Sequence, residues 1–290
     1  MARPHEYIGV SGVVNQEQQA ELEEMFAEFG LRDQRALQLG IKATHKTQYL
    51  GVENKYGSEW YPVGAQAKNV LRRNALDDWV YRKDLMGVAQ VCYDASEVYD
   101  RDYRRMFLFR MLGTSAIQTW LTGVQFDMLP DWCGHRMLTG LAQEVLEDDV
   151  AFLGDDSTYR PLTVTLQCQG DIMNAHTPSK IAETLTQFPH LDYVLFDASG
   201  GRGVRMNSET LLPYIEAVYD RPDLNHLDVA VGGGLNAEVV RAELPKILRH
   251  FPDVSWDAEG QLHPVNAEGK RPLDMTVCRE YLEACAEVLC

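Results

Sequence analysis

Two glycine-rich turns are the places in this sequence where residue types and spacing could do chemistry. The apolar run Tyr193–Asp197 (YVLFD) closes on one acid and leads directly into ASGGRGVR, and the run from Leu227 (LDVAV) leads into GGGLN. Glycine allows tight turns and leaves backbone N–H groups uncovered, so such turns can hold an anion, usually phosphate. The alternative, that the glycines only shape tight turns, is weakened because two such turns follow neighbouring strands. The expected ligand-binding positions are Gly200, Gly201, Arg202, Gly203, Gly233 and Gly234, together with Glu259 and Gly260 in a later turn.

Three more acids follow predicted strands and could take part in proton transfer with Asp197. Asp94 and Asp127 each end an apolar run, and Glu259 precedes Gly260 in the turn DAEG. Acids that converge on one opening push their pKa values apart, which allows one to act as acid and another as base near neutral pH. Two other interpretations stay open. Asp94 and Asp127 could cap the following helices, and the three acids could hold Mg²⁺ through oxygen ligands.

Eight apolar or alternating runs, separated by helical patterns, predict the elements that must position these residues. This succession predicts an α/β fold, a (β/α)8 barrel with residues 1–290 in a single domain, because neighbouring parallel strands need right-handed helical crossovers. An open doubly wound sheet is the alternative. The predicted strands lie at 6–12, 35–44, 87–95, from 123 to near Asp127, at 161–170, at 193–197, from 227, and at 253–260.

Helix boundaries and long loops complete the expected barrel. Apolar residues at helical spacing run up to Gly30, and Thr177 followed by Pro178 is a typical helix start. Another helix is predicted over 100–121 from its acidic start and apolar stripe. Long loops are expected after the second and fourth strands. Residues 45–64 form a polar and aromatic stretch without clear period, which we expect to be a lid or specificity loop, with a decorative insertion as the alternative.

Composition limits the partners of this chain. The net charge is −16, from 43 acids against 27 Lys and Arg residues. Neither nucleic acid nor an anionic membrane is expected as a partner, because binding to them needs clustered cations. A small phosphorylated molecule held by local geometry is expected instead. The six cysteines lack CxxC or metal-like spacing, so no zinc site, disulfide scaffold or cofactor is expected.

The apolar segments also bear on location. No window is long enough for a signal peptide or a membrane span, so a cytoplasmic location is expected. The oligomeric state is not indicated by the sequence.

The segments FDASGGRG, VAVGGGLN and DAEG, with the following GKRPLD, resemble phosphoribosylanthranilate isomerase, a (β/α)8 enzyme of tryptophan biosynthesis. The resemblance covers the C-terminal third of the chain, and IGVSGVVNQEQ resembles the first strand of that family. It implies an isomerase or other proton-transfer enzyme acting on a phosphorylated sugar or ribosyl compound, because the family's Amadori rearrangement needs one acid and one base. By this resemblance Asp197 is the general acid, and the glycines of both turns form the phosphate cradle.

Several positions depart from the family pattern. Ser11 stands where the family has its cysteine general base, and an isolated serine hydroxyl cannot be tuned to that task. Asp127 takes the place of a histidine. Glu259 sits at or next to a phosphate-binding serine, where a carboxylate repels phosphate unless it turns away or pairs with Arg202 or Arg205. These departures predict a relative that kept the scaffold and the acid but changed its substrate. The alternative is a non-catalytic barrel that binds phosphate or a nucleotide after losing the base.

Overall fold

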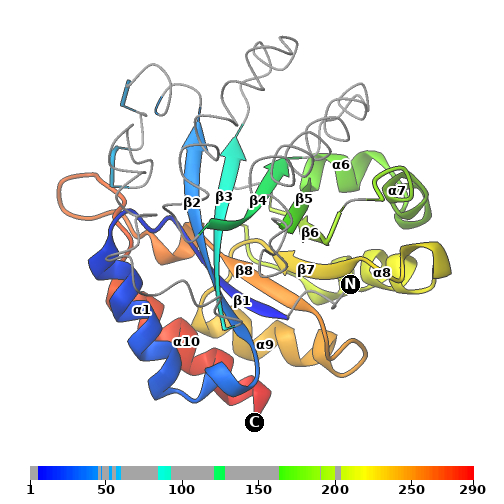
Figure 1. The fold of residues 1–290 in the computed structure, drawn as a ribbon. Helices are drawn as coiled ribbons and strands as arrows, with labels where there is room; N and C mark the ends of the chain where they lie inside the picture. The colour runs from blue at the N-terminus through cyan, green and yellow to red at the C-terminus, as the bar shows by residue number, and fades with distance from the viewer. Residues whose placement is uncertain are drawn as a thin grey trace, which may run out of the picture.

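The strands of this chain close into a barrel in chain order. The computed structural model describes residues 6–44, 47, 52–53, 57–59, 84–92, 121–127, 163–189, 191–199 and 204–290. The last strand pairs with the first, and every neighbouring pair is parallel, which is the (β/α)8 topology (Figure 1). The predicted fold is confirmed. The strands are β1 (Tyr7–Ser11), β2 (Ala36–Thr44), β3 (Leu85–Cys92), β4 (Leu121–Asp127), β5 (Thr163–Gln169), β6 (Tyr193–Asp197), β7 (Asp228–Gly232) and β8 (Ser255–Ala258).

Helices cover the outside of the barrel, and α10 lies beside both α1 and α9 (Figure 1). The described α-helices are α1 (Gln16–Glu28), α6 (Gly170–Ala175), α7 (Pro178–Leu185), α8 (Ser208–Tyr219), α9 (Ala237–Leu248) and α10 (Met275–Leu289). Short 3-10 turns follow at η1 (Leu31–Asp33), η3 (Pro222–Leu224) and η4 (Gly260–Leu262).

Local chemistry sets the helix boundaries. The side chains of Asn15, Thr177 and Asn236 each accept a hydrogen bond from a backbone N–H in the first turn of the following helix. Pro178 occupies the first turn of α7, where its missing N–H is harmless. Gly30 follows the C-cap residue of α1 and has a φ of 70°, in the left-handed region that is typical of the residue after a helix. The helix signals at Gly30 and Thr177 are therefore confirmed.

Alternate strand residues point into the barrel and divide its interior into two layers. At the amino end an apolar cluster fills the interior, and the rings of Tyr7 and Tyr193 meet edge to face with centroids 5.2 Å apart. Towards the carboxyl ends the same inward positions carry polar residues, such as Asp197 on β6 and Asp257 on β8. The outward positions pack against the helices in the main core, which includes Trp256. The interior is therefore apolar at the amino ends of the strands and polar at their carboxyl ends. The opening of the barrel at the carboxyl ends is called the mouth below.

Some predicted boundaries were wrong. The third strand is described up to Cys92, which pairs with Thr44 of β2, and its predicted end at Asp94 lies outside the described residues. The eighth strand ends at Ala258, which leaves Glu259 in the turn that follows. Leu121 pairs with β3 and begins β4, so it does not belong to the predicted helix 100–121. The short helix α6 was not predicted, because its six residues are too few for a helical pattern.

The expected long loops lie mainly outside the described residues. Of the predicted lid at 45–64 only residues 47, 52–53 and 57–59 are described, and 128–162 are not. The lid therefore stays a prediction.

Candidate functional site

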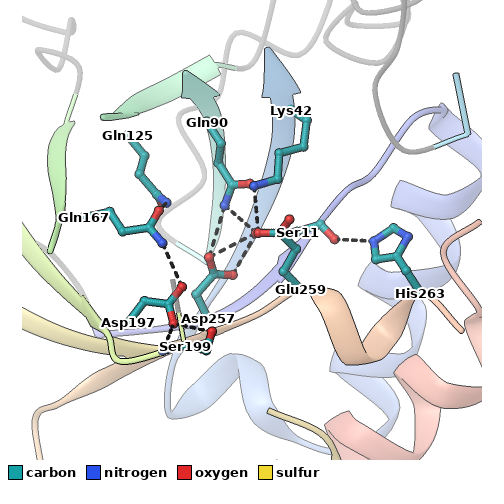
Figure 2. Close-up of polar contacts among 10 residues, drawn as sticks. All are labelled: Ser11, Lys42, Gln90, Gln125, Gln167, Asp197, Ser199, Asp257, Glu259 and His263. Atoms are coloured by element: carbon teal, nitrogen blue, oxygen red, sulfur yellow. Dashed lines mark hydrogen bonds and ion pairs between the residues drawn. The ribbon is translucent and has the colours of Figure 1, made fainter. Parts of the chain in front are cut away.

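The polar side chains of the mouth form two hydrogen-bonded groups and one ion pair (Figure 2). They come from seven strands, all but β7, and from the turns after β6 and β8. Active sites of (β/α)8 enzymes occupy this end of the barrel, so the candidate site lies here. Its members are Ser11, Lys42, Gln90, Gln125, Gln167, Asp197, Ser199, Asp257 and Glu259.

The first group surrounds Asp257, a buried acid on β8. Ser11 Oγ lies 2.9 Å from Oδ1 and 3.1 Å from Oδ2 of Asp257, and Gln90 Nε2 donates to Oδ2 at 3.1 Å. Gln90 Nε2 also donates to Ser11 Oγ. Because a hydroxyl group has one hydrogen, Ser11 Oγ accepts a hydrogen bond from Gln90 and donates one to the Asp257 carboxyl group. A Cβ at Gly9 would overlap the Asp257 carboxyl group, and one at Gly40 would overlap Ser11 Oγ, so glycine at both positions makes room for the group.

The environment of Asp257 favours its protonated form. Burial raises the pKa of Asp257 to about 7, and the negative charges of Glu259 and Asp197 add to this effect. The hydrogen bond from Ser11 and the charge of Lys42 act in the opposite direction. Asp257 can therefore give or take a proton close to neutral pH.

The second group surrounds Asp197, at the end of β6. Its Oδ1 accepts from the backbone N–H of Ser199 at 2.9 Å and from Ser199 Oγ at 2.6 Å. Its Oδ2 accepts from Gln167 Nε2 at 3.0 Å, and Gln167 Oε1 in turn accepts from Gln125 Nε2 at 2.8 Å. A carboxylate accepts all three of these bonds, so the group holds Asp197 in one orientation with its negative charge satisfied.

Lys42 and Glu259 form the ion pair of the mouth, with Nζ and Oε2 2.7 Å apart. The Lys42 side chain is only 8% exposed, so its charge acts in a weakly screened environment. The sequence led us to expect Glu259 to turn away or to pair with Arg202 or Arg205. The structure pairs it with Lys42 instead, while Arg205 pairs with Glu238. Lys42 lies on β2 and was not predicted as a site residue.

The turn after β7 lies beside the end of β6 and beside Val204, whereas the expected first glycine turn at 200–203 lies outside the described residues. Gly233 and Gly234 have φ values of 105° and 58°, which an L side chain rarely adopts. A Cβ at Gly233 would lie 2.8 Å from Asp197 Oδ1 and 3.3 Å from Ser199, and one at Gly234 would overlap the backbone of Val204. The turn after β7 therefore contacts the chain on both sides of 200–203.

His263 joins the turn after β8 to the end of β1. It is fully buried, with Nε2 2.9 Å from the carbonyl oxygen of Ser11 and Nδ1 3.0 Å from that of Arg271. Burial lowers the pKa of His263. Arg271 donates to the carbonyl oxygens of His263 and Gly260. A neutral imidazole has one N–H, so His263 donates to one of the two carbonyl oxygens, while the bonds of Arg271 fix the turn that carries Glu259.

The predicted site residues divide into three sets. Ser11, Asp197, Gly233 and Glu259 lie at the mouth. Gly234 packs against Val204, and Gly260 accepts from Arg271 behind the turn. Asp94, Gly200, Gly201, Arg202, Gly203 and the side chain of Asp127 lie outside the described residues.

Sequence reasoning missed Lys42, Gln90, Gln125, Gln167, Ser199 and Asp257. All of these except Ser199 are polar strand residues whose neighbours on either side in the sequence are apolar. In a barrel such a residue faces the interior, so a signal was present in the strand alternation.

The described residues contain neither a candidate metal-binding cluster nor a candidate membrane-spanning helix. No group of three or more His, Cys, Asp or Glu side chains in the described part of the chain is arranged to hold a metal ion. Within the same residues no helix is long and apolar enough to cross a membrane.

Comparison with known proteins supports the fold and leaves the family open. No protein-family model and no curated protein matches the sequence. The structure is similar to the tryptophan synthase subunit alpha from Legionella pneumophila, with 12% identity, a TM-score of 0.55, and coverage of 98% of this chain and 92% of the other. Triosephosphate isomerase from Bartonella henselae is also similar, with 10% identity, a TM-score of 0.41, and coverage of 95% and 98%. At such identities the likeness shows the barrel alone.

Proposed function

We propose that this barrel is an enzyme that moves protons on a phosphorylated sugar or ribosyl compound, as an isomerase distantly related to phosphoribosylanthranilate isomerase. One observation carries the proposal. Two buried acids, Asp197 and Asp257, share the mouth but lie in different hydrogen-bonding environments. Two titratable groups in contrasting environments are what acid and base catalysis at one substrate requires.

The two environments also suggest which acid donates a proton to the substrate and which accepts one. Three donors face Asp197, an arrangement that suits a carboxylate. The raised pKa of Asp257 suits a group that is partly protonated near neutral pH. Asp257 is therefore proposed to supply the proton and Asp197 to receive one. This reverses the role that the family resemblance implied for Asp197, and it makes Ser11 a supporting residue for Asp257.

The anionic part of the ligand has two candidate contacts. The turn of Gly233 and Gly234 brings backbone to the edge of the mouth beside Asp197, and the glycines at 200, 201 and 203 with Arg202 are proposed to complete the cradle. Lys42 supplies a positive charge in the same mouth, at present held by Glu259. A phosphorylated small molecule fits this combination better than a neutral sugar.

A catalytic assay with matched variants tests the proposal. The wild-type protein is mixed with N-(5-phosphoribosyl)anthranilate or with ribose 5-phosphate, and conversion is followed by NMR. Asp197→Asn and Asp257→Asn should each lower kcat by roughly a hundredfold or more. The exposed Asp220→Asn serves as the control and should leave kcat unchanged.

The second candidate function is a non-catalytic barrel that binds a phosphorylated ligand. The observation in its favour is Ser11, a serine in the place of the family's cysteine base. It would be supported if wild type bound ribose 5-phosphate without converting any ligand and Asp197→Asn bound it equally well. Isothermal titration calorimetry on both proteins measures this.

A further inference from the structure

The side chains of Gln125 and Gln167 form a chain of amides that ends on Asp197. Gln125 Nε2 donates to Gln167 Oε1 at 2.8 Å, and Gln167 Nε2 donates to Asp197 Oδ2 at 3.0 Å (Figure 2). Both glutamines are buried, at 3% and 9% exposure. Neither residue was identified from the sequence, and neither has a role in the proton transfer proposed above.

The direction of this chain is fixed by its last member. A carboxylate only accepts hydrogen bonds, so Gln167 must present its NH₂ group to Asp197 and its oxygen to Gln125. Gln125 must then present its own NH₂ group. If the Gln167 amide were reversed, its oxygen would face a carboxylate oxygen and its NH₂ group would face the NH₂ group of Gln125. The order Gln125, Gln167, Asp197 is therefore imposed by hydrogen-bond chemistry.

The stagger of the barrel lines these side chains up. Gln125 pairs in register with Thr165, and Gln167 lies two residues further along β5. Gln167 pairs with Leu195, and Asp197 lies two residues further along β6. Each step thus moves one strand around the barrel and one inward position towards the mouth, as the tilt of barrel strands requires. The chain rises from the interior to the candidate catalytic acid.

A purely structural role fits these glutamines poorly. Gln125 Oε1 is buried, and no group in the described part of the chain bonds it. Buried polar atoms without partners destabilise a fold, and an apolar pair of similar size would fill the same space without that penalty. What the amides provide and an apolar pair cannot is a fixed donor to Asp197.

We propose that Gln167 is a positioning residue that holds the Asp197 carboxylate in its reactive orientation, and that Gln125 keeps the Gln167 amide from turning. This inference rests on the proposed function in one respect only, that Asp197 reacts with a ligand. The two donors of Ser199 fix Oδ1, and Gln167 fixes Oδ2, so the plane of the carboxylate is set from both sides. Positioning of this kind affects the chemical step more than binding.

NMR of the side-chain amides tests the hydrogen-bonded series of Gln125, Gln167 and Asp197 without any substrate. Gln167→Met and Gln125→Met each remove one NH₂ signal from the ¹⁵N spectrum and so assign both. Asp197→Asn should then shift the NH₂ signals of both glutamines, because Asn can present a donor and allow the Gln167 amide to turn. The exposed Gln187→Met is the control and should leave both signals in place. Unchanged Gln125 signals in Asp197→Asn would overturn the inference.

Kinetics with the converted substrate tests the positioning role. Gln167→Met should lower kcat roughly tenfold to a hundredfold with KM within about twofold of wild type, because the residue orients the acid and does not touch the ligand. Gln125→Met should lower kcat less, and the double variant no more than Gln167→Met alone. A change confined to KM, or additive effects, would contradict positioning. If Asp197→Asn shifts both NMR signals but the protein converts no ligand, the proposed function is wrong, whereas the hydrogen-bonded order of the two amides and Asp197 is confirmed.

Discussion

Asp197 on β6 and Asp257 on β8 lie two strands apart, and Gly232 of β7 pairs in register with both. All three occupy inward positions, and a Cβ at Gly232 would lie 3.9 Å from the Cβ of Asp197. Because Gly232 has no side chain, β7 places no side chain between the two acids at this register position. Their charges therefore interact across a short, buried path.

The first prediction concerns the charges around Asp257. Glu259→Gln should lower the pKa of Asp257, since the negative charge of Glu259 raises it, whereas Lys42→Met should raise this pKa further. Asp197→Asn should lower it by less than Glu259→Gln does, because Asp197 is the weaker influence. Carbon-13 NMR titration of the labelled Asp257 carboxyl group measures all three.

Glu268→Gln is the control for this series. Glu268 is an exposed acid that pairs with Lys270 and has no influence on Asp257. Its replacement should leave the titration of Asp257 in place. A pKa that is equally insensitive to Glu259→Gln would mean that the ion pair with Lys42 cancels the charge of Glu259 at Asp257.

The second prediction is a pH dependence of stability. The pKa of Asp257 is raised from 3.8 to about 7 in the folded protein. Between these values the folded state keeps a proton that the unfolded state releases, so the contribution of Asp257 is complete below pH 3.8 and is lost as pH rises towards 7. The loss is at most about 1.4 kcal/mol per pH unit, or roughly 4 kcal/mol in total.

Urea unfolding of wild type and Asp257→Asn between pH 4 and pH 8 measures this loss. The free energy of unfolding of wild type, relative to the variant, should fall as pH rises through this window. The opposite contribution of His263, whose pKa is lowered by burial, is present in both proteins and cancels in the difference. A difference that does not change with pH would show that Asp257 is charged throughout.

The third prediction concerns the turn after β7. Gly233→Ala forces an L side chain to a φ of 105° and places its Cβ 2.8 Å from Asp197 Oδ1. Gly30→Ala is the matched control, because its φ of 70° is also positive but no atom lies within 4 Å of the added Cβ. We expect Gly30→Ala to destabilise the protein by about 1–2 kcal/mol through the backbone alone. Gly233→Ala should cost at least about 1 kcal/mol more.

Thermal unfolding of both variants, with binding of ribose 5-phosphate by calorimetry, measures the difference. Only Gly233→Ala should weaken binding, since the control lies at the end of α1. Equal effects of the two substitutions on binding would remove Gly233 from the ligand site.

The sequence predicted the barrel well because the relevant signals are local. Thr177 before Pro178 marks the start of α7, and the run YVLFD marks β6, without knowledge of distant contacts. Boundaries failed where pairing decides them, as at Leu121, which pairs with Gly87 of β3 and begins β4 although the local pattern assigned it to a helix. The local sequence pattern therefore determines which strands and helices form, and pairing between strands determines the residues at which they begin and end.

The candidate site was only half predictable, because its decisive contacts are long-range. Ser11 and Asp257 are 246 positions apart, and nothing near Ser11 in the sequence reveals an acid beside it. The four-residue strand SWDA did contain a usable signal, because the acid alternates with buried Trp256 and Ala258 and so must face the interior. Glu259 was predicted in its place because it lies at the carboxyl end of the predicted strand and, by the family resemblance, at or next to a phosphate-binding serine. The structure shows that Glu259 lies past the strand end and pairs with Lys42.

The fourth prediction separates two roles for Ser11. If Ser11 only supports Asp257, Ser11→Ala removes a hydrogen bond that lowers the pKa of Asp257, so this pKa should rise and the pH profile of kcat should move upwards. Most of the turnover at the new optimum should remain. Ser208→Ala is the matched control, because Ser208 is also buried and donates to a carboxylate, Glu243, at 2.7 Å outside the mouth. Both variants should lose about 1–3 kcal/mol of stability, but only Ser11→Ala should shift the pH profile. Complete loss of turnover in Ser11→Ala at every pH would instead make the Ser11 hydroxyl a reacting group.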